Sequence, residues 1–281
     1  QATHVIKWIQ LETGMARRVF RGHTGPVTSL AATHSGASST VDLLISGSWD
    51  KTIKLWDMAT GECVRTLAGH SDFIKCLALV PGGRVYRSPA GGSAKETTPW
   101  LFSGSTDATI RQWDLRTGQC VRTFPKVHSR GIDDLVYDGS TNTLFSASSD
   151  TTIRQWNIVT GQVVPPSPKT GTRVVPNDAD DDDDDTELWS CSADKDIKQW
   201  CPRTGQCIIT LTHPNVVKSL TVTDAHVITG CRDENIRIWS KATGKCLKVL
   251  VGHFDEITGL AVIDQTIYST SLDGTLRKWQ I

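Results

Sequence analysis

An Asp followed six residues later by a Trp recurs along this chain of 281 residues, and this repeat constrains the fold more than any other feature. Self-similarity at an interval of about forty residues is the signature of a repeat array, and that interval is the length of one four-stranded blade. A seventh Trp, Trp8, has Ala2 where the Asp would stand. Six segments carry the pattern: Asp50–Trp56, Asp107–Trp113, Asp150–Trp156, Asp194–Trp200, Asp233–Trp239 and Asp273–Trp279.

Further positions recur in register with this pair. A hydroxyl residue stands four positions before each Asp, and a Thr-Gly pair closes each unit. Five units also carry an upstream His: His23, His70, His128, His213 and His253. The fourth unit has no His and carries several prolines after Gly161, so we expect its first strand to be short and poorly paired.

These shared positions resemble the WD40-repeat family over nearly the whole chain. The resemblance implies an all-β fold, a WD40 β-propeller of four-stranded blades, with residues 1–281 forming a single domain. We expect a seven-blade register with an incomplete N-terminal blade, because residues 5–8 form a good strand that six blades would leave unused. On that reading the chain is a fragment of a longer one. The alternative is six closed blades, in which residues 17–21 complete the last blade.

The resemblance also implies that His, Ser or Thr, Asp and Trp of each unit form one buried chain of hydrogen bonds. The same residue types occur in catalytic triads, but a nucleophile is not repeated around a ring, so we expect no catalytic residue and no enzyme. The predicted tetrads are His23, Ser46, Asp50, Trp56; His70, Ser103, Asp107, Trp113; His128, Ser146, Asp150, Trp156; His213, Thr229, Asp233, Trp239; and His253, Ser269, Asp273, Trp279.

The cysteines and the hydropathy restrict the class of protein further. None of the eight Cys stands in a clustered zinc-ligand spacing, so we expect neither a metal nor a cofactor. Cys63, Cys120, Cys207 and Cys246 recur in equivalent positions, which favours free thiols and a cytoplasmic or nuclear location. No apolar run approaches the roughly 20 residues of a membrane span.

Charge is balanced overall but unevenly distributed. The chain has 30 basic and 30 acidic residues, yet Asp178–Glu187 is almost wholly acidic. We expect a solvated loop there, with contact to a basic partner as the alternative. No basic face with interleaved aromatic residues is present, so the sequence does not favour nucleic-acid binding.

The resemblance implies that partners bind at the face that carries the turn before each Asp and the loop after each His. Large side chains at such tips predict a surface for other proteins or peptides. Three insertions, in 33–42, 81–99 and 177–187, make the opposite face the alternative. The predicted function is a non-enzymatic protein–protein interaction scaffold. The alternatives are a phosphodegron-reading substrate receptor of a ubiquitin ligase and a sensor domain of a larger signalling protein. The candidate binding residues are Trp49, Phe73, Arg130, Arg232, Phe254 and Leu272.

Overall fold

The computed structural model describes residues 4–33, 42–80, 99–139, 141–165, 173–176 and 187–280. Within these ranges every regular element is a β-strand, so the predicted all-β class is confirmed. The described part holds no helix that could cross a membrane. The long insertions and the acidic run up to residue 186 lie outside the described residues.

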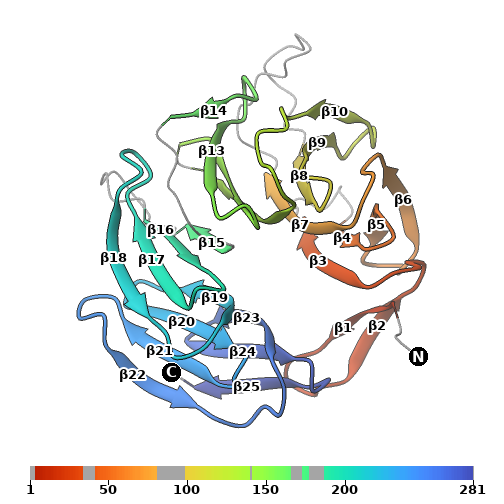
Figure 1. The fold of residues 1–281 in the computed structure, drawn as a ribbon. Helices are drawn as coiled ribbons and strands as arrows, with labels where there is room; N and C mark the ends of the chain where they lie inside the picture. The colour runs from red at the N-terminus through yellow and green to blue at the C-terminus, as the bar shows by residue number, and fades with distance from the viewer. Residues whose placement is uncertain are drawn as a thin grey trace. The chain divides into compact units, whose positions relative to one another are not determined.

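The chain divides into two compact units, residues 1–150 with 156–162 and residues 151–155 with 163–281. The first unit begins with a two-stranded sheet, β1 (Ile6–Ile9) and β2 (Ala16–Phe20), followed by antiparallel four-stranded sheets in chain order. These are β3 (Val27–Ala32), β4 (Leu43–Ser48), β5 (Thr52–Asp57), β6 (Cys63–Ala68); and β7 (Ile74–Val80), β8 (Trp100–Ser105), β9 (Ile110–Asp114), β10 (Cys120–Thr123) (Figure 1). The division of the chain passes through the next sheet, which consists of β11 (Ile132–Asp138), β12 (Thr143–Ser148), β13 (Ile153–Asn157) and β14 (Val163–Val164).

The second unit continues the pattern. Its sheets are β15 (Arg173–Pro176), β16 (Leu188–Cys191), β17 (Asp196–Trp200), β18 (Cys207–Thr212); β19 (Val217–Val222), β20 (His226–Cys231), β21 (Ile236–Ser240), β22 (Cys246–Leu250); and the three-stranded β23 (Ile257–Ile263), β24 (Thr266–Ser271), β25 (Leu276–Gln280). As expected, β15 in the fourth unit is short, but it pairs with β16 along its whole length.

The sheets match the repeat units one for one. Among the described residues six of them have three or four strands, which matches the six-blade alternative. The strand expected to complete the last blade does not do so, because β2 pairs with β1 in a further two-stranded sheet and β23–β25 stays three-stranded. Assignment of β1–β2 to an incomplete seventh blade stays a prediction, and so does the single-domain reading.

The Asp of each unit shapes the turn between the second and third strands, as predicted from the sequence. In the first unit, Asp50 Oδ1 accepts from the backbone N–H of Thr52 at 3.0 Å and from its hydroxyl at 2.6 Å. The residue after the Asp adopts a left-handed conformation even where it is not Gly, with φ of 69° at Lys51 and 64° at Ala108. The carboxylate therefore stabilises a turn that its own neighbour does not favour.

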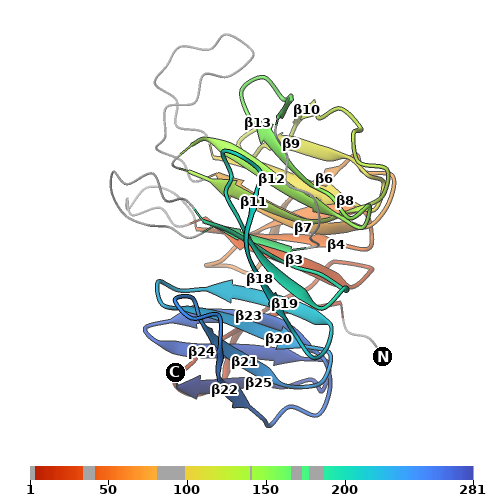
Figure 2. The same cartoon turned by 60° about the vertical axis from the view of Figure 1, so that its left-hand side comes forward.

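Neighbouring sheets approach closely because small residues stand on the second strand. A Cβ added to Gly47 would lie 2.7 Å from Ile74 Cγ2, and one added to Gly104 would lie 2.6 Å from Ile132 Cγ2. The first strands of successive sheets are accordingly neighbours, β3 with β7 and β7 with β11 in the first unit and β19 with β23 in the second (Figure 2). This packing buries Ile45, Ile53, Ile74, Leu101 and Trp113 in one core cluster.

Candidate protein-binding surface

In five repeat units a backbone hydrogen bond fastens the Asp turn to the loop that precedes the first strand of the same sheet. The donor is the N–H of the residue before the turn Asp, and the acceptor is the carbonyl three residues after the His position. The bonds are Trp49 N to Pro26 O (2.9 Å), Thr106 N to Phe73 O (2.9 Å), Ser149 N to Gly131 O (3.2 Å), Arg232 N to Val216 O (2.9 Å) and Leu272 N to Glu256 O (3.0 Å). Turn and loop therefore present their side chains at the same end of each sheet.

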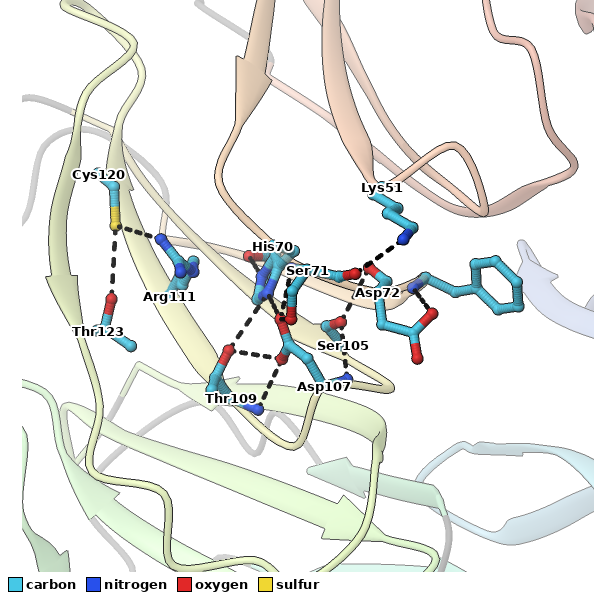
Figure 3. Close-up of polar contacts among 12 residues, drawn as sticks. Lys51, His70, Ser71, Asp72, Ser105, Asp107, Thr109, Arg111, Cys120 and Thr123 are labelled. Carbon is cyan, nitrogen blue, oxygen red and sulfur yellow. Dashed lines mark hydrogen bonds and ion pairs between the residues drawn. The ribbon is translucent and has the colours of Figure 1, made fainter.

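The second repeat unit has the predicted tetrad, and Figure 3 shows two of its members, His70 and Asp107, beside the turn residue Thr109. His70 Nδ1 is 2.9 Å from Asp107 Oδ2, and His70 Nε2 is 2.7 Å from Ser103 Oγ. A carboxylate only accepts, so Nδ1 carries the proton and Nε2 accepts from the Ser hydroxyl. The indole N–H of Trp113 donates to the same Oγ at 2.8 Å. The first, third and sixth units repeat this arrangement around His23, His128 and His253.

The local environment keeps the imidazole neutral and the carboxylate ionised in the first unit. Burial lowers the pKa of His23, and the hydrogen bond and charge of Asp50 offset this only in part. Burial acts to raise the pKa of Asp50, but hydrogen bonds from Thr52, His23 and the Thr24 backbone together lower it to about 2. The tetrad is thus a satisfied polar network that fixes the turn and the loop relative to each other.

The fifth unit departs from the predicted tetrad. Trp239 still donates to Thr229 Oγ1 at 3.1 Å, but the imidazole of His213 bonds the backbone of Asn215 through Nδ1. Asp233 instead forms a two-armed ion pair with Arg237, at 3.0 and 2.8 Å. The expected His213–Asp233 contact is therefore wrong for this unit.

Pro214 and Asn235 distinguish this unit, because Asn235 stands where Thr52, Thr109 and Thr275 donate their hydroxyls to the turn Asp. In the four regular units the residue after the His donates its backbone N–H to the turn Asp, as Thr24 N does to Asp50 Oδ2 at 3.0 Å. Proline has no N–H to donate. Asp233 thus lacks two of the donors that hold its counterparts beside the imidazole, and it turns to Arg237.

In the first of the two compact units, the side chains of Trp49 and Phe73 lie together. Their rings stack nearly parallel, with centroids 4.9 Å apart and an angle of 10° between the planes. Both are partly exposed, Trp49 at 47% and Phe73 at 37%. Arg130 is also exposed, on the loop of the next repeat, and its carbonyl oxygen accepts from Ser148 Oγ at 3.2 Å. Within the described residues no hydrogen bond or cation–π contact joins Arg130 to the stack.

The second of the two compact units carries three exposed candidate residues at the ends of two neighbouring sheets: Arg232, Phe254 and Leu272. Arg232 Nε is 2.8 Å from Glu256 Oε1, an ion pair that sequence reasoning missed. The Arg277 guanidinium lies 5.6 Å above the Phe254 ring. The repeat phase places Glu256 three residues after His253, in the loop, but it does not reveal which side chain of the neighbouring sheet its carboxylate meets.

The remaining predictions on chemistry concern metals, thiols and the acidic run. The eight cysteines are free. Within the described ranges no cluster of His, Cys, Asp and Glu could hold a metal ion. Of the acidic run, only Glu187 is described, and it pairs with Lys241 and accepts from the indole N–H of Trp189 at 3.1 Å.

The repeated four-stranded sheets, each with its Asp turn and buried Trp, define a β-propeller repeat protein. The family model for the WD domain, G-beta repeat, matches residues 14–57, 61–114, 118–157, 205–240 and 244–280. The chain belongs to the WD40 family. The fourth unit, which has no His, falls in the stretch that these matches leave out.

Several curated proteins and solved structures are similar to this chain. An uncharacterised WD repeat-containing protein of Schizosaccharomyces pombe is 34% identical, over 100% of this chain and 74% of that protein. The nuclear distribution protein PAC1 of Gibberella zeae is 35% identical over 98% of this chain. The match covers 54% of the PAC1 protein, about half of its length. The crystal structure of the computationally designed Ika8 protein has a TM-score of 0.69 and 27% identity, covering 96% of this chain and 75% of that one.

Proposed function

We propose that this protein is a non-enzymatic interaction scaffold that binds other proteins or peptides through the turn and loop tips of its sheets. The observation that carries the proposal is the exposed stack of Trp49 on Phe73. The two rings come from neighbouring repeats, and backbone hydrogen bonds fasten the turn of each repeat to its loop. A partner would therefore meet a preformed aromatic surface and would immobilise few side chains on binding.

The equivalent positions of neighbouring repeats provide a comparison for Trp49 and Phe73. At the position of Trp49, the next two units have Thr106 and Ser149, which are ordinary turn residues. At the position of Phe73, the first and third units have Pro26 and Gly131. Among these equivalent positions, large aromatic side chains thus occur only where the first and second repeats meet. Aromatic residues anchor many protein interfaces.

The relatives support a scaffold without fixing a partner. Their printed names differ, from nuclear distribution protein PAC1 to mitochondrial division protein 1 of Schizosaccharomyces pombe, which is 26% identical over 89% of this chain. Relatives that share the fold therefore have different names, and the fold alone does not identify a partner. For the phosphodegron-reading alternative, one of the two candidate arginines, Arg232, is already engaged by Glu256, so no observation favours it.

The test compares affinity-purified partners of the wild-type protein with those of a Trp49→Ala/Phe73→Ala variant. Loss of two interface anchors typically weakens binding more than tenfold, so we expect the partners to be lost. Ile208→Ala is the matched control, because Ile208 is 58% exposed on strand β18, away from the turns. A partner set that survives in the double variant and disappears in the control contradicts the proposal.

A further inference from the structure

In the first of the two compact units, an arginine of one sheet bonds the next sheet along the chain. Arg65 Nη1 donates to Thr117 O at 2.5 Å, and Arg122 Nη1 donates to Val159 O at 2.9 Å. Both acceptors lie in the turn between the third and fourth strands of the following sheet. Both arginines stand on the fourth strand of their own sheet, four residues after the Gly of a Thr-Gly pair. These contacts are called the inter-sheet arginine bonds below.

The sheet of the fourth repeat unit, β15–β18, cannot form such a bond on either side. It is called the fourth sheet below. The equivalent positions hold Pro165, just after β14 of the preceding sheet, and Ile209 in β18. Neither side chain has a hydrogen-bond donor. In the fifth unit a cation stands at this position again, and Lys248 Nζ donates to Gln280 O at 3.4 Å. The fourth sheet therefore lacks the donor at both of its neighbours.

The polar network of the fourth sheet is also reduced. In the second unit, Asp107 lies 2.9 Å from the ring nitrogen of His70, which joins the turn to the loop before the first strand. The fourth unit contains no His. Among the described residues, the carboxylate of Asp194 accepts only the N–H of Asp196, within its own turn, at 2.9 Å. The second strand is short as well, since β16 has four residues and its five counterparts have six.

Apolar burial does not compensate for these missing bonds. Trp189, Cys191 and Leu211 of the fourth sheet lie in one core cluster with Trp239 of the fifth. The first and second sheets share a core cluster of the same kind, and the Arg65 bond joins them in addition. Apolar packing is therefore common to both places, whereas the arginine and histidine bonds are not.

We propose that the fourth sheet opens locally as one unit while the other sheets stay folded. Local opening is expected where few bonds hold an element to its surroundings. The opening carries the thiol of Cys191 into solvent, because this side chain is buried on β16 in the closed state. The device belongs to the fold itself and does not depend on which partner the turn tips bind.

Labelling of buried thiols under native conditions measures this opening. Cys191 and Cys76 are both free and only 1% and 4% exposed, the first in the fourth sheet and the second in the sheet of the second unit. Iodoacetamide reaches each thiol only when its sheet opens. We expect Cys191 to be labelled at least about tenfold faster than Cys76, the equivalent of one or two missing hydrogen bonds. Its labelling should also depend less on urea than global unfolding followed by circular dichroism, because less surface is exposed.

Two substitutions test the cause. Ile209→Arg supplies the donor found at Arg65 and Arg122, and it should slow the labelling of Cys191 about fivefold. Ile209→Met is the matched control, because it gives an unbranched side chain without a donor, and we expect less than about a twofold change. Conversely, Arg65→Met removes a bond to the second sheet, so it should speed the labelling of Cys76 and leave that of Cys191 unchanged.

Hydrogen exchange followed by mass spectrometry shows whether the sheet opens as one unit. We expect the amides of β16, β17 and β18 to exchange together and before those of β8 and β9. If β17 and β18 stay as protected as β9 while Cys191 reacts quickly, only one strand fluctuates and the proposal is overturned. Equal labelling of Cys191 and Cys76, or unchanged labelling of Cys76 in Arg65→Met, would also overturn it. The last comparison decides the matter even where Ile209→Arg fails to fold.

Discussion

Arg237 donates two hydrogen bonds from its guanidinium to the carboxylate of Asp233, at 3.0 and 2.8 Å. They lie in the one repeat unit in which a proline, Pro214, follows the His. In the first unit the equivalent cation, Lys54, reaches Thr66 Oγ1 on the neighbouring strand at 2.9 Å. The same repeat position therefore has a surface contact in one unit and a half-buried ion pair in another. Two donors to the turn Asp are missing in the fifth unit, since Pro214 has no N–H and Asn235 stands where Thr52 supplies its hydroxyl.

The first prediction compares these two cations. Arg237→Gln leaves the carboxylate of Asp233 without its partner, and we expect the free energy of unfolding to fall by about 1–3 kcal/mol, since removing one member of a partly buried pair leaves a charge uncompensated. Lys54→Gln should change it by less than about 0.5 kcal/mol. Urea denaturation of both variants measures this, and equal losses would show that the Arg237 pair is no more than a surface contact.

The second prediction concerns pH. Burial, reinforced by the positive charge of Arg237, lowers the pKa of His213 from its ordinary value of 6.5 to about 4. The folded state therefore binds this proton less readily than the unfolded state, so the stabilisation is complete above pH 6.5 and is lost as the pH falls toward 4. Linkage gives a loss of about 2 kcal/mol between pH 7 and pH 5 from this group. His213→Gln should show a pH dependence weaker by that amount, and an unchanged dependence would contradict the assignment.

The third prediction concerns the buried indoles. Trp113→Phe removes the N–H that Ser103 Oγ accepts in a fully buried site, and we expect a loss of about 1–3 kcal/mol. Trp279, only partly buried on β25, makes the equivalent bond to Ser269, so Trp279→Phe should cost less. Thermal unfolding followed by circular dichroism ranks the two variants, and the reverse order would argue against burial as the cause.

The fourth prediction concerns the thiols. Cys201 follows Trp200 at the position where Asp57 accepts turn N–H groups from Ala59 and Thr60. The hydroxyl and N–H of Thr204 lower the pKa of the Cys201 thiol, aided by the N–H of Arg203. We expect iodoacetamide at neutral pH to label Cys201 faster than the exposed Cys63, because the thiolate is the nucleophile. Thr204→Val should slow the labelling of Cys201, and mass spectrometry of the digested protein would expose any contrary order.

The repeat pattern was enough to predict the strands, the Asp turns and the residues of the hydrogen-bonded tetrads. Each of these depends on residues inside one repeat unit. The exchange of partners in the fifth unit was not predicted. It depends on donors that are missing at Pro214 and Asn235, and their absence is informative only once the roles of the equivalent groups are known from the other units. The stack of Trp49 on Phe73 joins two units, and the phase of the repeat placed the two residues on adjacent units without giving their contact. The phase of the repeat also places Glu256 at this end of its sheet, but it does not show that Arg232 of the neighbouring sheet lies within reach of its carboxylate.

The turn and loop tips are the proposed protein-binding surface. Site-specific photo-crosslinking tests this directly, with a benzoylphenylalanine in place of Phe73 and, in a second variant, in place of Ile208 on β18. A partner recovered by affinity purification should crosslink through position 73 and not through position 208. Crosslinking through position 208, with none through position 73, would place the partner on the strands instead and contradict the account.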